Sequence, residues 1–163
     1  DFEVIIIPAQ EISSTIISST KIRAAINSGS FDKAKQFLGR DYEINGKVVR
    51  GDGLGRKIKF PTANINLEES YKLIPPKGVY LVIVEYNGKE YSGMMNIGNR
   101  PTINGNHQTL EVNIFNFTKS IYNEYLKVKF LKKIRDEKKF DSIESLRRQL
   151  LIDKEICKRK MSE

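Results

Sequence analysis

The chain has 163 residues, of which 39% are hydrophobic and 29% are charged, proportions that are ordinary for a soluble globular protein with a buried core. No apolar run approaches the length of about eighteen residues that a membrane span needs, and no secretory signal is recognisable, so we expect a cytoplasmic protein with no membrane partner. The single cysteine, Cys157, excludes an internal disulfide and fits a reducing compartment.

The positive charge is concentrated near the C-terminus. The formal net charge is +8, and the stretch from Lys119 to Lys160 holds 14 Lys and Arg against 7 Asp and Glu. Such a stretch is typical of a solvated basic face, although it can also bind nucleic acid. Aromatic residues do not alternate with the basic ones, so we expect the solvated face and no nucleic-acid partner.

The first forty residues differ from the rest. Residues 1–7 have the apolar pattern of a strand that belongs to a larger fold, which suggests that this sequence is a piece of a longer chain. Two short helices are predicted next. The first is capped by Ser19 or Thr20 and closed by Gly29, and the second is capped by Ser30 and ends at Gly39.

Strands dominate the pattern that follows. Extended structure is favoured over residues 42–49, 79–84, 89–97, 109–115 and 125–130. Asn87 and Gly88 predict a tight hairpin between two of these segments, since both residues tolerate positive φ. Residues 79–84 are apolar throughout, as expected of a strand that is buried on both sides.

A helix closes the chain. We expect Asp141 and Glu144 to form its capping box. The residues expected on its buried stripe are Ile143, Leu146, Leu150 and Cys157. A run of short antiparallel strands with one terminal helix predicts a mainly β fold, a closed barrel that the helix plugs or flanks.

The segment after the first barrel strand is rich in glycine and basic residues. Gly51, Gly53 and Gly55 allow backbone amides to approach an anion closely, and Arg56 and Lys57 add positive charge. The segment lacks the Gly-Lys-Ser/Thr ending of a Walker A loop, and an extended stretch follows it where a Rossmann turn would have a helix. The pattern favours phosphate binding, but a flexible hairpin tip has a similar composition.

Two polar residues follow this loop. Thr62 and Asn64 are two positions apart, so in an extended strand they lie on the same side. A hydroxyl and a carboxamide are oxygen donors that Mg²⁺ accepts while it binds phosphate oxygens. They could equally be two surface residues of a strand that begins at Pro61.

These residues also carry a resemblance. The sequence Pro61-Thr62-Ala63-Asn64 after a glycine loop resembles the riboflavin kinase family, in which PTAN is the identifying motif. Further similarity is found in the stretches NIGNRPT (96–102), LEVNIFNF (110–117), IRDEKKF (134–140) and SLRRQL (145–150). The stretch ISSTKIR (17–23) is similar to the end of the FMN adenylyltransferase domain that precedes the kinase in bacterial bifunctional enzymes.

The resemblance implies a closed six-stranded antiparallel barrel that transfers the γ-phosphate of ATP to riboflavin with the help of Mg²⁺. It assigns Glu111 as the base, which alternates away from its apolar neighbours and can face a cleft. It assigns Thr62 and Asn64 to Mg²⁺ and phosphate. The residues that it places over the ATP phosphates are Gly53, Gly55, Arg56 and Lys57. Arg135 and Phe140 are the residues that it places beside the flavin.

The resemblance also implies a domain organisation. Residues 1–40 would be a remnant of the adenylyltransferase domain with linker helices, and residues 41–163 the riboflavin kinase domain. The expected partners are riboflavin, FMN, ATP, ADP and the missing N-terminal domain. The chain departs from the family at four positions, because glycine is usual at Lys59 and Asn123, His at Asn113 and Asp at Asn116.

Two other functions remain open at this point. One is a basic barrel that binds nucleic acid, and the other is a flavin-binding module without catalysis. A metal site or triad based on histidine is not expected, because His107 is the only histidine. We interpret Cys157 as a core residue rather than a nucleophile.

Overall fold

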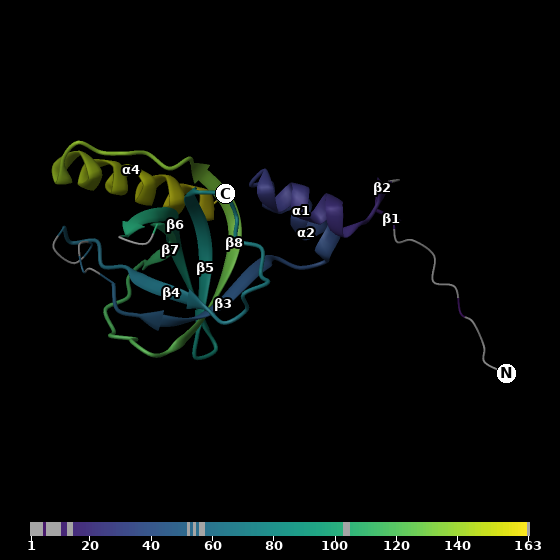
Figure 1. Ribbon diagram of the computed structural model, residues 1–163, viewed down its shortest axis with the longest axis horizontal. Helices are drawn as coiled ribbons and strands as arrows, with labels where there is room; N and C mark the ends of the chain where they lie inside the picture. The colour runs from purple at the N-terminus through teal and green to yellow at the C-terminus, as the bar shows by residue number, and fades with distance from the viewer. Residues whose placement is uncertain are drawn as a thin grey trace.

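The computed structural model of the chain describes residues 5, 11–12, 15–51, 53, 55, 58–102 and 105–162. Apart from Ile5, the strand predicted over residues 1–7 lies outside them. The strands of the main sheet are β3 (Tyr42–Val49), β4 (Ala63–Leu67), β5 (Gly78–Tyr86), β6 (Lys89–Thr102), β7 (Gly105–Ile114) and β8 (Tyr125–Arg135). They close into an antiparallel barrel in the order β3-β4-β7-β6-β5-β8 (Figure 1). The predicted six-stranded closed barrel is confirmed.

Alternating side chains build the barrel. Ile44, Val48, Leu110, Val112 and Ile114 point inward, and polar neighbours on the same strands point outward. β5 is buried on both sides, as its continuous apolar run predicts. The hairpin between β5 and β6 also forms as predicted, with positive φ at both of its turn residues. The last strands are longer than predicted, since β6 continues to Thr102 and β8 to Arg135.

A short hairpin and two helices precede the barrel. β1 (Glu11–Ile12) pairs with β2 (Thr15–Ile16), and α1 (Ser19–Asn27) and α2 (Phe31–Leu38) follow. The cap of α1 is Ser18, whose Oγ accepts a hydrogen bond from the Lys21 amide at 3.3 Å, so the predicted cap, Ser19 or Thr20, is one or two residues late. Both helices bury residues in the core of the barrel. Phe31 stacks on Phe130 with the ring centroids 5.2 Å apart.

α4 (Ile143–Ser162) lies against the outside of the barrel, over β6 and β8 (Figure 1). The predicted helix therefore flanks the barrel and does not plug it. It covers a second apolar core that consists of Ile58, Phe60, Val79, Leu81, Met94, Phe115 and Cys157. Of the helices in the described residues, none combines the length and apolar character that crossing a membrane demands.

Two predictions about α4 are wrong in detail. Its capping residues are Ser142 and Ser145, not Asp141 and Glu144, because the Ser142 Oγ accepts from the Ser145 amide at 3.1 Å. Ile143 is 59% exposed, because it begins the helix before the helix reaches the barrel. A buried aspartate, Asp153, stands on the inner stripe where periodicity would favour an apolar residue.

Part of the C-terminal positive charge forms ion pairs at the surface. The Lys129 Nζ lies 2.6 Å from a Glu90 oxygen and 3.3 Å from a Glu85 oxygen, and Lys158 pairs with Glu155 at 2.9 Å. The hydrogen bond from Lys129 lowers the pKa of the Glu85 carboxyl. Because these groups are solvated, each pair contributes little to stability.

Candidate active site

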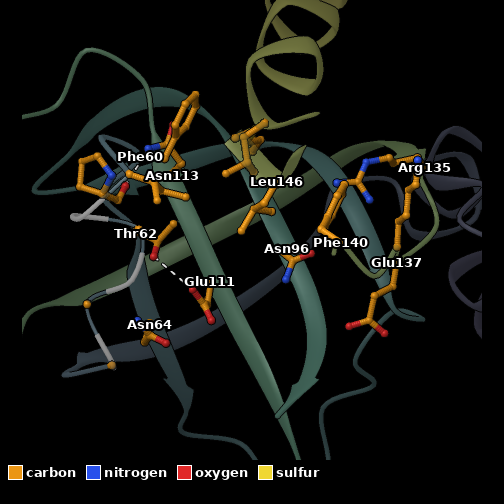
Figure 2. Close-up of a pocket in the computed structure, with 18 of the residues that line it drawn as sticks. Phe60, Thr62, Asn64, Asn96, Glu111, Asn113, Arg135, Glu137, Phe140 and Leu146 are labelled. Atoms are coloured by element: carbon orange, nitrogen blue, oxygen red, sulfur yellow. Dashed lines mark hydrogen bonds between the residues drawn. The ribbon is translucent and has the colours of Figure 1, made fainter. Parts of the chain in front are cut away.

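A cavity of about 360 Å³ opens on the outer wall of the barrel. Its walls are the glycine loop, the outward faces of β4, β7 and β6, the segment that follows β8, and the first turns of α4 (Figure 2). These parts are separated by long stretches of sequence, and closure of the barrel brings them together. The cavity is lined by most of the residues that the sequence singled out.

Strand register places three polar side chains in one row across the cavity floor. β7 lies between β4 and β6, so Glu111 stands opposite Asn64 on one side and Asn96 on the other. All three line the cavity. Leu110 and Val112 point into the barrel core, which confirms the predicted alternation around Glu111. Opposed residues of neighbouring strands have Cβ atoms only about 5 Å apart, so the row can act on one ligand group.

Two hydrogen bonds tie the residues before β4 to β7. The Thr62 hydroxyl donates to Glu111 Oε2 at 3.1 Å (Figure 2). The Asn113 carboxamide donates to the Pro61 carbonyl at 2.7 Å. Asn113 is 6% exposed and sits two residues from Glu111 on the same face of β7. It therefore fixes the backbone on which Thr62 is carried, a role that the sequence analysis missed because the partner is a distant carbonyl.

The glycine loop touches the same two polar residues. A Cβ on Gly51 would lie 2.3 Å from the Asn64 side chain. A Cβ on Gly55 would lie 2.3 Å from the Phe60 carbonyl oxygen and 3.2 Å from the Thr62 hydroxyl. The backbone at Gly51 and Gly55 thus lies directly against Asn64 and Thr62, and at Gly55 the approach to a carbonyl oxygen leaves no room for a side chain.

The family model described as riboflavin kinase (Flavokinase) matches residues 38–161. The chain belongs to the riboflavin kinase family. Bifunctional riboflavin kinase/FMN adenylyltransferase of Bacillus subtilis is 43% identical over 85% of this chain and 45% of its own length. That of Haemophilus influenzae is 46% identical over 87% of this chain and 46% of its own length. The chain spans slightly less than half the length of these relatives.

Solved structures resemble this member of the riboflavin kinase family too. Riboflavin kinase from Trypanosoma brucei has a TM-score of 0.51 and 26% identity, over 74% of this chain and 80% of its own. A crystal structure from Streptococcus pneumoniae, described as a macrolide-efflux protein, has a TM-score of 0.86 and 41% identity, over 94% of this chain and 50% of its own. The family has a nucleotide and a flavin as substrates.

Thr62 and Asn64, which line the cavity, carry oxygen atoms of the kind that Mg²⁺ accepts. The Thr62 hydroxyl donates its proton in the hydrogen bond to Glu111, so the lone pairs of its oxygen can face a cation. Mg²⁺ typically takes one or two protein oxygens and completes its shell with water and phosphate. Within the described residues there is no cluster of three His, Cys, Asp or Glu, and this mode of binding requires none. The residues present therefore fit the metal.

The side of the cavity toward α4 is apolar. Ile58, Phe60 and Met94 belong to the second core, and Leu146 and Leu150 come from α4. Figure 2 shows Leu146 above Glu111, on the side away from Asn64. An aromatic ring system can pack on this apolar surface with water excluded. The opposite, polar side of the cavity can form hydrogen bonds with a polyol or a phosphate.

The predicted flavin residues are at the end of the cavity away from Thr62. Arg135 ends β8 and Phe140 follows five residues later, and both line the cavity (Figure 2). The Arg135 guanidinium carbon is 5.8 Å from the centroid of the Phe140 ring. Arg56 and Lys57, the basic residues predicted to cover the phosphates, lie outside the described residues.

Three of the four departures from the family sequence fall where the backbone is left-handed. φ is 62° at Lys59, 54° at Asn116 and 65° at Asn123. Glycine is the usual family residue at Lys59 and Asn123 because it adopts this conformation without strain. Asparagine tolerates it, whereas Lys59 carries a strain of about 1–2 kcal/mol. All three residues therefore hold a left-handed backbone, and Lys59 does so at the highest cost.

Proposed function

We propose that the chain catalyses transfer of the γ-phosphoryl group of ATP to the 5′-hydroxyl of the riboflavin ribityl chain, giving FMN and ADP. The observation that carries the proposal is the hydrogen bond between Thr62 and Glu111 at the centre of the cavity. It joins a group suited to magnesium and phosphate to a carboxylate suited to accepting a proton. A phosphoryl donor and a hydroxyl acceptor would meet there.

The nucleotide occupies the side formed by the glycine loop. Thr62 and Asn64 bind Mg²⁺ and phosphate oxygens, and the backbone at Gly53 and Gly55 covers the phosphates together with Arg56 and Lys57. Bound Mg²⁺ supplies charge neutralisation for the transferred group. Support comes from the close approach of the loop to Thr62 and Asn64.

The flavin occupies the α4 side, between Phe140 and the apolar wall, with its ribityl chain directed toward Glu111. Glu111 accepts the proton of the 5′-hydroxyl as the oxygen attacks phosphorus. Asn96 and Asn64 flank the carboxylate, so the hydroxyl approaches along a fixed direction. Phosphoryl transfer of this kind depends mainly on position and electrostatics, which a preformed row provides.

We also propose that residues 41–163 form the kinase domain, and that residues 1–40 are the end of an adenylyltransferase domain with its linker helices. The ISSTKIR stretch supports this division. Ile26 and Phe31 are buried in the barrel core, so the linker helices are held to the kinase whatever precedes them. The rest of such an adenylyltransferase domain would be a partner of the kinase.

The direct test is an assay with riboflavin, ATP and Mg²⁺, in which FMN is separated by chromatography. We expect FMN and ADP to form in equal amounts, and we expect the reaction to stop when EDTA removes the metal. A parallel reaction with the Glu111→Gln variant controls for contaminating kinases. If the purified chain binds riboflavin but forms no FMN over hours with Mg-ATP, the proposed activity is wrong.

Thr62→Ala and Asn64→Ala should each raise the KM for Mg-ATP by about tenfold or more, because each removes an oxygen from the metal–phosphate side. Riboflavin affinity measured without nucleotide should stay within twofold. Asn66→Ala is the matched control, since Asn66 is on the same strand and the same face as Asn64 but is exposed outside the cavity. Equal loss of riboflavin affinity in both cavity variants would instead show that the pair shapes the barrel wall.

A further inference from the structure

We propose that Asp153 of α4 is a positioning residue for flavin binding, which acts by holding Arg135 and, through Arg135, the segment 135–140 against the cavity. The inference rests on the proposed function, because it assigns Asp153 to the flavin side of that site. Asp153 does not line the cavity itself.

The carboxylate of Asp153 is completely buried and fully bound. Arg135 Nε donates to both carboxylate oxygens at 3.0 Å, and Arg135 Nη2 donates to Oδ2 at 2.8 Å. Gln149, one turn earlier on α4, donates to Oδ1 at 2.9 Å. A buried carboxylate is tolerated only when it is paired in this way. The two-point contact fixes the plane of the guanidinium as well as its place.

The Arg135 guanidinium in turn organises the closing segment. Its Nη1 donates to the Asp136 carbonyl at 2.9 Å, and its central carbon lies over the Phe140 ring. The segment has a second attachment, since the Asn99 amide donates to a Glu137 carboxylate oxygen at 3.3 Å. Figure 2 shows Arg135, Glu137 and Phe140 grouped at this end of the cavity. A substitution at Asp153 would therefore displace Phe140 through the Arg135 side chain, which contacts both residues.

The need to attach α4 to the barrel does not explain why a charged residue stands at Asp153. Leu146, Leu150 and Cys157 already pack the helix on the second core. A buried ion pair often adds no stability over well-packed apolar residues of similar volume. The two-point contact does, however, fix the direction of the guanidinium. The ion pair between Asp153 and Arg135 therefore fixes the orientation of the Arg135 guanidinium at the flavin end of the cavity.

The test measures riboflavin affinity by quenching of flavin fluorescence, without ATP. Asp153→Asn should raise the Kd for riboflavin by roughly 3- to 100-fold, the range typical of coupled residues in one network. The KM for Mg-ATP should stay within twofold. In a Phe140→Ala background, Asp153→Asn should add little further loss, because its effect passes through the position of Phe140. Cys157→Ala is the control: it weakens the packing of the same helix face and should lower Tm without changing the Kd.

Three results would overturn the inference. Asp153→Asn could lower Tm yet leave the Kd unchanged, which would make Asp153 a purely structural residue. Its effect on the Kd could instead multiply with that of Phe140→Ala, which would show that Asp153 does not act through the position of Phe140. If Asp153→Asn does not fold, Gln149→Ala takes its place, because Gln149 contacts the Asp153 carboxylate and does not line the cavity. The same raised Kd and unchanged KM for Mg-ATP are expected, and an unchanged Kd would be the third result. A parent chain that binds no riboflavin would contradict the proposed function as well, so the two failures are distinguishable.

Discussion

Glu111→Gln is expected to lower the turnover of riboflavin phosphorylation by about 10²- to 10⁴-fold, the usual contribution of a positioned base. The amide oxygen of Gln can still accept the hydrogen bond from the Thr62 hydroxyl, so the cavity should keep its shape. What is lost is the ability to take the proton of the attacking hydroxyl. Steady-state kcat and riboflavin Kd, measured on the same preparations, separate these effects: kcat should fall while the Kd changes little.

Glu90→Gln is the matched control for Glu111→Gln. Glu90 is also a strand carboxylate, but it pairs with Lys129 on the barrel surface and does not line the cavity. Its variant should retain the parent turnover. Should Glu111→Gln keep a turnover within a few-fold of the parent, Glu111 would not be the base, and another acceptor near Thr62 would have to be sought.

The second large effect is expected from Gly55→Ala, which should lower kcat/KM for Mg-ATP by about 10²-fold, because a misplacement of about 1 Å is enough for such a loss. The new methyl group would lie 2.3 Å from the Phe60 carbonyl oxygen. Phe60 cannot easily give way, since its side chain is buried in the second core and its amide donates to the Gly55 carbonyl at 2.7 Å. The loop must therefore shift away from Thr62.

Two other glycines show how large an effect backbone strain alone has, for comparison with Gly55→Ala. Gly53 and Gly88 both have φ of 71°, and a Cβ on either would meet nothing within 4 Å. Alanine at each should cost a similar backbone strain, about 1–2 kcal/mol of stability. Gly88 is at the β5–β6 hairpin, so Gly88→Ala should lower Tm and leave the kinetics unchanged. If Gly55→Ala loses no more activity than Gly88→Ala, the close approach of the loop to Thr62 is not needed for nucleotide use.

Much of the fold follows from local sequence patterns. The alternation of Leu110, Glu111 and Val112 predicted which side chain leaves the core, and Asn87-Gly88 predicted the hairpin turn. These signals are local, because side-chain direction alternates along a strand and positive φ favours a few residue types. The strand bounds were less accurate, since β6 continues to Thr102 and β8 continues beyond its apolar run to Arg135, which lines the cavity.

The assembly of the candidate site depended on tertiary structure. Asn64, Glu111 and Asn96 form one row because β7 pairs with both β4 and β6, and hydrophobic periodicity does not encode which strands become neighbours. The same applies to Asp153, whose position on an apolar stripe is explained only by Arg135, eighteen residues earlier in the chain. The sequence by itself determined which residues leave the core and where the chain turns, since these choices depend on neighbouring residues. Closure of the barrel decided which of those residues meet, because contacts between distant strands and helices are made only when the whole core is packed.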